Sequence, residues 1–409
     1  MTIRIPASLI NQLKLLHDKK RSLELYGETI ARGVGAFKAK YNIPGISVAI
    51  SRHGRLEYAE AFGWTRLPSL GESPALTETN TFRSASISKI ITAACIMRLV
   101  QDKQLKLDHT IFGSSGVLGT TYGTKSYTGY TTQQTIRQLL NHTSGWSNLD
   151  TVGAGLDPMF TSAGMNRSQI IDYMLDQRPP MRQPGLLHEY SNFGYCLLGR
   201  VIEKVTGKTY EQYAKEAILS KCGISRMHIG TESRASAGSD EVHYYAEDPQ
   251  DPYKLRVSLF DSHGGWVASP IDLLKLEREI GVFSPKTGIL SVATKSEIAT
   301  GSTDAPGYGL GLEIWLSDTT IAPYPPPGAR MVKYAGHSGW MIGTMGFMMS
   351  RMDGYSFAFL ANKQPMRQSG EPRPFDAIAY IRDEIIWPAL ASASGTSYES
   401  YDLFPLYEK

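Results

Sequence analysis

The sequence predicts an α/β protein in which an antiparallel sheet is built from both ends of the chain and flanked by helices. A mainly helical region is expected to be inserted between the two strand-rich parts. Three observations support this: short β-rich runs occur in the first 64 residues, helical periodicity follows them, and β-rich runs return from residue 308 before a final helix. The chain has 409 residues and is 42% hydrophobic, so it can bury a large core.

The N-terminal part is expected to begin with helices and to continue into a hairpin. Residues 1–20 predict a short amphipathic helix that packs on the body of the protein, and a second helical pattern covers about 23–41. A β-rich run at 46–50 is followed by a His53-Gly54 turn and a returning run at 56–64. The apolar face of the first helix carries Leu9, Ile10, Leu13 and Leu16.

Ser86 and Lys89 begin an apolar helical run that is predicted to end near Asp108. Positions i and i+3 share one face of a helix, so the hydroxyl and the amine are expected side by side. A serine hydroxyl needs an adjacent base, and a lysine amine can act as one if burial lowers its pKa. Free N–H groups at the helix start would stabilise developing negative charge, which suits acyl transfer. The apolar positions of the run are Ile87, Ile90, Ile91, Ala94, Met97 and Val100.

The same pair has a simpler interpretation as an exposed helix start. Ser84 or Ser86 would then be an N-cap, and Lys89 would be solvated. Because short motifs often arise by chance, the catalytic interpretation depends on partners elsewhere in the chain.

The middle of the chain is expected to be helical, with helices at about 168–176 and 195–205. Residues 113–132 are rich in Gly, Ser, Thr and Tyr, which predicts an ordered surface loop. His142 is interpreted as a hydrogen-bonded turn residue. A further helix is expected from Ser269-Pro270, where proline suits the first helical position.

Tyr190 and Asn192 are the first candidate partners of the serine, on a loop just before a helix. A tyrosine hydroxyl can pass a proton to a leaving group if a nearby cation lowers its pKa. An asparagine amide can donate to a substrate carbonyl. The alternative is a packed tyrosine followed by a capping asparagine.

The last third predicts strands at about 310–316, 341–349 and 357–360, and a final helix at about 375–387. Between these runs lies a second group of candidates, in which glycines would let a strand edge approach a ligand. His337 is predicted to supply a hydrogen bond or a positive charge beside Tyr190, and the Trp340 N–H is predicted to face an oxyanion. An ordinary turn with a surface histidine is the alternative. The stretch reads Gly336-His337-Ser338-Gly339-Trp340.

Composition argues against several other classes of protein. Lys and Arg number 42 and Asp and Glu 39, a net charge of +3 that gives no reason to expect nucleic acid. No run is long enough for a membrane span, and residues 1–20 are too polar for a signal peptide, so a cytoplasmic protein is expected. Three scattered cysteines predict no disulfide framework, and no His or Cys spacing predicts a metal site or a cofactor.

Taken together, the segments Ser86-x-x-Lys89, Tyr190-x-Asn192 and His337-x-Gly339 resemble the serine β-lactamase and penicillin-binding protein superfamily. The similarity is closest to its class C β-lactamase-like branch, with family VIII esterases, D-aminopeptidases and the fungal acyltransferases that modify statins. It covers about residues 31–390 in matching order. Further similar stretches are Pro44-Gly45-Ile46, Leu139 to Gly145, Gly264-Gly265 and Tyr308-Gly309-Leu310-Gly311.

This resemblance implies a β-lactamase/DD-peptidase-like fold and a serine acyl-enzyme. Ser86 would attack the carbonyl, Lys89 and Tyr190 would move the proton, and Ser86 and Trp340 would form the oxyanion hole. The third motif departs from the Lys-Thr-Gly of true β-lactamases, which puts strong binding of a β-lactam carboxylate in doubt. The implied substrate-binding residues are Asn192, His337, Ser338 and Gly339.

The expected domain organisation is one catalytic domain at 21–392, preceded by the 1–20 helix and followed by a tail at 393–409. Its sheet part covers about 21–78 and 255–392, and its helical part covers about 79–254.

The predicted function is hydrolysis of a small ester or amide. The alternative is an acyltransferase that passes the acyl group from a thioester or carrier-protein donor to an alcohol or amine. A third interpretation is an inactive homologue used for binding or self-assembly. The acyl group, the acceptor and the loops that would select them are left open by the sequence. These loops are 113–132, 153–166 and 322–328.

Overall fold

A computed structural model provides the structure of the protein. The predicted helix at 1–20 and the loop at 322–328 lie outside the described residues, as do part of the 153–166 loop and most of the 393–409 tail. The described residues are 26–68, 74–127, 129–146, 157–161, 164–247, 249–284, 287–301, 307–318, 331–365, 374–392 and 402–407.

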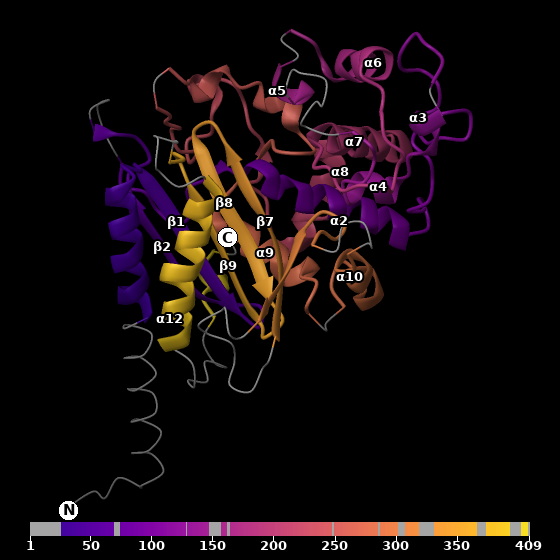
Figure 1. Ribbon diagram of the computed structural model, residues 1–409. Helices are drawn as coiled ribbons and strands as arrows, with labels where there is room; N and C mark the ends of the chain where they lie inside the picture. Colours follow the sequence, from indigo (N-terminus) through magenta and orange to yellow (C-terminus); the bar gives the residue numbers. More distant parts are fainter. Residues whose placement is uncertain are drawn as a thin grey trace, which may run out of the picture.

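Six antiparallel strands form the main sheet in the order β2-β1-β9-β8-β7-β6 (Figure 1). The first strand pairs with the last, so that Val48 lies between Glu60 and Phe359 in the register. This confirms the predicted α/β fold class with a sheet from both chain ends. The strands are β1 Gly45–Arg52, β2 Arg55–Gly63, β6 Glu313–Asp318, β7 Met331–Met341, β8 Thr344–Arg351 and β9 Tyr355–Ala361.

The hairpin between β1 and β2 turns at the two residues that the sequence predicted. His53 has φ +51° and Gly54 has φ +77°. Positive φ at both central residues matches the right-handed twist of the paired strands, which is why glycine suits this turn.

The outer face of the sheet is covered by a helix at 26–40 and by the C-terminal helix. Ile30, Phe347, Phe359 and Trp387 meet there in one buried apolar cluster. The predicted final helix is therefore present, with a π-helical stretch in its middle. Its segments are α11 Pro374–Tyr380, η7 Ile381–Ile386 and α12 Trp387–Ser392.

The inner face of the sheet packs against α2, Ser88–Gln101, and α9, Pro270–Ile280, and beyond these lies the inserted helical region (Figure 1). A small three-stranded sheet, in the order β3-β5-β4, joins this region to the main sheet. Its strands are β3 Phe82–Arg83, β4 His228–Ile229 and β5 Trp266–Ala268. The other helices are α3 Gly129–Gln133, α4 Ile136–Leu140, α5 Pro158–Thr161, α6 Arg167–Gln177, α7 Asn192–Thr206, α8 Tyr210–Ala217 and α10 Val292–Ile298.

Two predicted boundaries were wrong for local reasons. The serine–lysine helix ends at Gln101 instead of near Asp108, because the chain turns at Lys103 with φ +60°. The predicted strand at 341–349 contains the turn between β7 and β8, where Gly343 has φ +87°. Apolar residues continue through this turn, so the sequence pattern does not reveal it.

A third difference concerns the loop that carries Tyr190. Helix α7 begins at Asn192, with Ser191 as its N-cap, so Asn192 belongs to the first helical turn instead of the loop. The Ser191 hydroxyl accepts a hydrogen bond from the Gly194 N–H, which is the usual way such a cap ends a loop.

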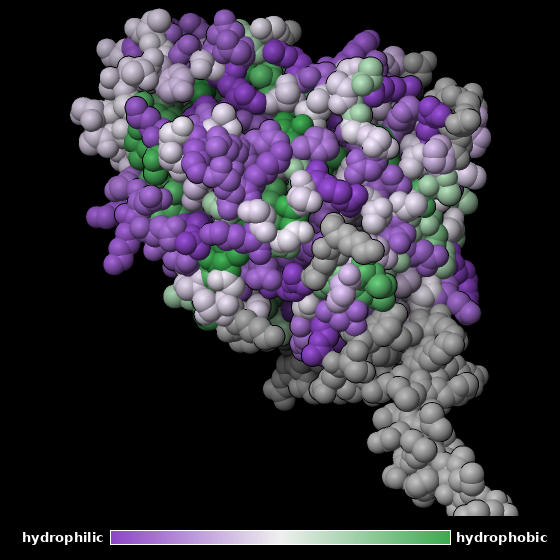
Figure 2. Space-filling view, turned by 180° about the vertical axis from the view of Figure 1, so that it is seen from behind, coloured by the Kyte–Doolittle hydropathy of each residue, from purple (hydrophilic) through white to green (hydrophobic). Residues whose placement is uncertain are grey.

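The surface seen in Figure 2 is mostly hydrophilic, and the hydrophobic residues on it form small separate areas. Within the described part of the chain, no helix combines the length and apolar character needed to cross a membrane.

We expect Phe359→Ala to lower the free energy of unfolding by about 3–5 kcal/mol, because this fully buried side chain fills the outer core. Met352→Ala is the matched control, since that side chain is 57% exposed, and it should change stability by less than about 0.5 kcal/mol. Urea unfolding followed by circular dichroism measures both. Equal effects of the two substitutions would contradict the described packing.

Candidate active site

Ser86 lies on a short 3₁₀ turn, η2 Ala85–Ile87, directly before α2. Its neighbours Ala85 and Ile87 are buried, whereas Ser86 is partly exposed. Ala85 has φ +49°, a conformation that costs a non-glycine residue about 1–3 kcal/mol and is found mainly at functional sites. The N–H groups of a first helical turn have no intrahelical partner, so that of Ser86 is suited to bind an oxyanion.

The Lys89 amine is completely buried and makes three polar contacts. Its Nζ lies 3.1 Å from Ser86 Oγ, 2.6 Å from Asn192 Oδ1 and 2.8 Å from the carbonyl oxygen of His263. Burial lowers the pKa of Lys89 well below its ordinary value, although nearby carboxylates oppose the shift. A neutral amine has two N–H donors and one lone pair. In that form the amide and the carbonyl would accept the two hydrogens, and the lone pair would be left for the Ser86 hydroxyl.

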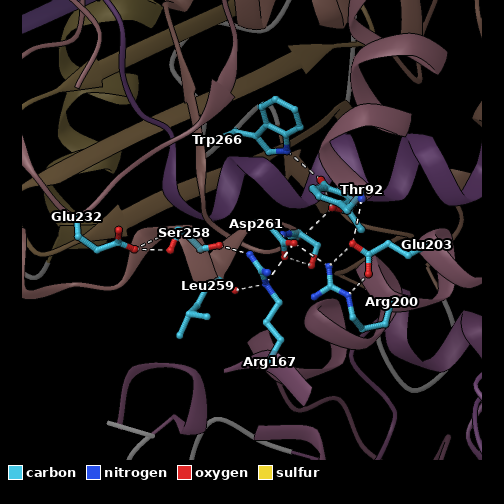
Figure 3. Close-up of polar contacts among 11 residues, drawn as sticks. Thr92, Arg167, Arg200, Glu203, Glu232, Ser258, Leu259, Asp261 and Trp266 are labelled. Carbon is cyan, nitrogen blue, oxygen red and sulfur yellow. Dashed lines mark hydrogen bonds and ion pairs between the residues drawn. The ribbon is translucent and has the colours of Figure 1, made fainter. Parts of the chain in front are cut away.

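The carbonyl that binds Lys89 belongs to a loop that is held by charged side chains (Figure 3). The Asp261 carboxylate lies 2.7 Å from Arg200 and 3.3 Å from Arg167. Thr92, one turn after Lys89 on α2, donates to the Ser262 carbonyl over 2.6 Å. The network therefore fixes the loop against α2 just before the carbonyl that accepts from the lysine.

Asn192 connects Lys89 to a partly buried carboxylate, that of Asp157. Its Nδ2 donates to Asp157 Oδ2 over 2.5 Å, and Asp157 Oδ1 accepts from the Met159 N–H. Both ends of the amide thus have partners inside the protein, and its predicted donation to a substrate carbonyl stays a prediction. Asp157 was not predicted from the sequence, in which its only signal is its position before Pro158 at a short helix start.

The Tyr190 side chain lies beside those of Ser86 and Lys89, with Lys89 Nζ 4.7 Å from the centre of the Tyr190 ring. Burial raises the pKa of Tyr190 well above its ordinary value, and a hydrogen bond to the Ser86 side chain partly offsets the rise. The lowering of this pKa by a cation, on which the predicted proton transfer was conditional, is not found, because burial of the phenol outweighs the other effects. The phenol therefore keeps its proton and can pass it on.

Strand β7 presses against the serine turn at Gly339. A Cβ at this position would lie 2.4 Å from the Ser84 carbonyl oxygen and 3.3 Å from Ala85 Cβ, so only glycine fits. This contact brings the strand next to the residues that flank Ser86, and Trp340 is the following residue. The structure thus fits a role for the Trp340 N–H in an oxyanion hole, which stays a prediction.

His337 and Ser338 lie on opposite faces of β7, because side chains alternate along a strand. The Ser338 hydroxyl donates to Glu313 Oε1 over 2.9 Å, and its register partner Phe347 belongs to the outer core. His337 faces inward but is buried, and both ring nitrogens have partners in Tyr308 and the Ser338 carbonyl. The predicted contacts of His337 and Ser338 with a substrate stay predictions.

Burial lowers the pKa of His337 to about 3, and the nearby Lys89 adds to the effect. The imidazole is therefore neutral near pH 7, and the predicted positive charge beside Tyr190 was wrong. A histidine on a strand can face solvent or the core, and the sequence alone does not decide between them.

Two more residues at the site were not among the predicted catalytic set. His142 contacts the Tyr190 ring with 4.3 Å between ring centres, and Tyr308 lies between His142 and His337. The sequence signals were present as a turn histidine and a Tyr-Gly pair, but nothing in them indicated that the two side chains meet. Among the described residues, no group of three or more His, Cys, Asp or Glu side chains is placed to hold a metal ion.

The family model named Beta-lactamase matches residues 30–380. A probable fimbrial assembly protein FimD, serogroup H1, from Dichelobacter nodosus is 28% identical over 253 residues, 59% of this chain and 58% of that protein. The chain thus spans less than two thirds of that relative. Penicillin-binding protein 4 from Amycolatopsis lactamdurans is 24% identical over 306 residues, 68% of this chain and 73% of that protein.

Solved structures share the fold. The octameric penicillin-binding protein homologue from Pyrococcus abyssi has a TM-score of 0.66 at 24% identity, over 93% of this chain and 80% of its own. D-amino acid amidase from Ochrobactrum anthropi SV3 has a TM-score of 0.66 at 20% identity, over 91% and 98%. EstCE1, a hydrolase with promiscuous acyltransferase activity, has a TM-score of 0.65 at 20% identity, over 88% and 99%.

We expect Asp157→Asn to move the acid limb of the pH–rate profile to lower pH, where the rate is that of acylation at the candidate nucleophile Ser86. The Asp157 carboxylate raises the pKa of Lys89, so its removal lowers that pKa and keeps the amine neutral at lower pH. The measurement is the pH dependence of the rate at which p-nitrophenyl acetate acylates Ser86. Asp108→Asn, at a side chain that is 89% exposed, is the control and should leave the limb in place. A shift to higher pH would contradict the described electrostatics.

Proposed function

Since this chain belongs to the Beta-lactamase family, we propose that it is a serine hydrolase that cleaves a small ester or amide through an acyl-enzyme on Ser86. The observation that carries the proposal is the arrangement around Lys89. A buried amine has two internal acceptors for its hydrogens, and its third contact is the Ser86 hydroxyl at 3.1 Å. This arrangement suits a neutral general base next to a nucleophile.

In acylation, Ser86 Oγ forms a bond to the substrate carbonyl carbon while its proton moves to Lys89 Nζ. The carbonyl oxygen becomes an oxyanion, which the N–H groups of Ser86 and Trp340 stabilise by about 3 kcal/mol each. Tyr190 then gives its proton to the departing alcohol or amine and recovers one from Lys89. The bond to the leaving group breaks, and the acyl group stays on Ser86.

Deacylation uses the same groups in reverse. Water takes the place of the leaving group, and Tyr190 with Lys89 removes its proton as its oxygen attacks the acyl carbon. The bond to Ser86 Oγ breaks, the serine regains its proton, and the free acid is released. No further acidic base is required, because the phenol and the amine already lie beside the serine.

The third motif supports an ester or a simple amide over a β-lactam. Recognition of a β-lactam carboxylate at this position would need a cation, and His337 is neutral with both nitrogens engaged. One structural relative points the same way, since it is a D-amino acid amidase.

A second candidate function is acyl transfer to an alcohol or an amine. EstCE1, which shares the fold, is a hydrolase with promiscuous acyltransferase activity. The residues that would activate water would equally activate an acceptor hydroxyl. A thioester or a carrier protein would then be the acyl donor.

We expect Ser86→Ala to reduce turnover of p-nitrophenyl butyrate by about 1,000-fold or more, and Lys89→Met to do the same, because nucleophile and base act as one unit. Intact-mass spectrometry should detect a butyryl adduct on the native chain that Ser86→Ala lacks. Lys106→Met, at an exposed lysine, should retain native turnover. Turnover by Ser86→Ala equal to that of the native chain would reject the proposal.

With an added alcohol, a hydrolase and a transferase give different products from the same acyl-enzyme. We expect butyric acid to be the main product of p-nitrophenyl butyrate in water, and butyl butyrate to appear in proportion to added 1-butanol. Gas chromatography measures both products. The free acid as sole product at every alcohol concentration would exclude transfer to this class of acceptor.

A further inference from the structure

His142 contacts Tyr190 and both of its chain neighbours. Its carbonyl oxygen accepts from the Glu189 N–H over 2.7 Å, and its Nδ1 accepts from the Ser191 N–H over 3.1 Å. Its ring packs on the Tyr190 ring with 4.3 Å between centres and a 41° interplanar angle. One residue therefore holds the backbone on either side of the phenol and the phenol ring itself.

The backbone of His142 adopts a conformation that few non-glycine residues adopt. Its φ is +61°, and the residue is only 1% exposed. Such a conformation persists only where the surrounding structure determines it, and it is concentrated at functional sites. Ala85, beside the candidate nucleophile, is another non-glycine residue with positive φ.

The hydrogen bonds of His142 fix its tautomer. Because Nδ1 accepts from a backbone N–H, it carries no hydrogen, and the hydrogen of the neutral ring is on Nε2. Nε2 lies 3.1 Å from the Tyr308 hydroxyl oxygen, to which it donates.

The same reasoning fixes the opposite tautomer at His337. The Tyr308 hydroxyl receives a hydrogen from His142, so it donates its own to His337 Nε2 over 2.9 Å. The His337 hydrogen is then on Nδ1, which donates to the Ser338 carbonyl over 2.5 Å. The chain of hydrogen bonds runs in one direction from the Ser191 N–H to the strand that contacts the serine turn.

We propose that His142 is a positioning residue that orients the Tyr190 hydroxyl toward Ser86, and that Tyr308 and His337 hold it in the required tautomer. The proposal rests on the proposed proton transfer by Tyr190. It assigns a task to the turn histidine and to the tyrosine of the Tyr308-Gly309 pair, neither of which contacts the Ser86 hydroxyl itself.

The surroundings keep His142 neutral. Burial lowers its pKa well below the ordinary value, and Lys89, His188 and His337 add to the effect. The rings of Tyr195 and Tyr308 also pack on it. Protonation would place a hydrogen on Nδ1 opposite the Ser191 N–H, and two donors would then face each other.

The first test reads the tautomers directly, without any substrate. Long-range ¹H–¹⁵N spectra of protein labelled with ¹⁵N-histidine distinguish Nε2–H from Nδ1–H rings, and loss of signals in His142→Asn and His337→Asn assigns the two residues. We expect His142 as the Nε2–H form and His337 as the Nδ1–H form at pH 7. The same tautomer at both residues, or a charged ring at either, would overturn the hydrogen-bond chain.

The second test compares two substitutions that both tolerate positive φ, Asn and Gly. His142→Asn keeps an acceptor near the Nδ1 position, whereas His142→Gly removes it. We expect kcat for p-nitrophenyl butyrate to fall about 100-fold or more in His142→Gly and to stay within about tenfold of native in His142→Asn. KM should change less than about threefold in both, because the ring orients a proton donor and does not bind substrate.

Tyr308→Phe tests the rest of the chain, since it leaves the His142 Nε2–H without its acceptor. We expect a kcat loss between those of His142→Asn and His142→Gly, and a mixture of His142 tautomers in the spectra. Tyr127→Phe is the matched control, because its hydroxyl donates to the Tyr122 carbonyl, away from His142 and Tyr190, and it should retain native kcat.

The outcomes separate the two proposals. Equal kcat in His142→Gly and His142→Asn, with turnover that still depends on Ser86, would overturn the positioning role alone. Turnover that does not depend on Ser86 would reject the proposed function, and with it the task of His142, while the tautomer spectra would still decide the hydrogen-bond chain.

Discussion

The other parts of the site depend on the burial of one amine, that of Lys89. Lys89 is completely enclosed, and a charged ammonium in that position would lose the solvation that water gives it. The fold meets this constraint with two acceptors from separate elements, the His263 carbonyl and the Asn192 amide oxygen. Once these are occupied by hydrogens of a neutral amine, its lone pair has Ser86 as partner. The same burial that makes the lysine costly in a folded protein suits it to the proposed role of base.

The acceptors must themselves be held in place, and much of the inserted helical region does this. Asp261 is bound by arginines from α6 and α7, which fixes the loop before His263 (Figure 3). Asn192 is fixed by its position on the first turn of α7 and by its bond to Asp157. The helical region thus positions the proposed base, and the sheet contributes β7. The site lies at the seam between them.

Local strain occurs where the chain must pass close to the serine. Ala85 has positive φ directly before Ser86, and His142 has positive φ beside Tyr190. Gly339 lets β7 approach to a distance at which any side chain would collide with Ser84. These positions lower stability locally and place the candidate nucleophile, the phenol and the strand within reach of one another, a pattern common at catalytic sites.

Local patterns in the sequence were enough to predict the fold class, the sheet built from both chain ends and the candidate nucleophile and base. Hydrophobic periodicity and the three-residue spacing of Ser86 and Lys89 are properties of short segments, so they can be recognised before the chain is folded. The direction in which burial shifts the pKa values of Lys89, Tyr190 and His337 and the joining of His142 to Tyr308 became visible only in the folded chain. Desolvation and hydrogen-bond direction depend on groups that are distant in the sequence and meet only when the protein folds.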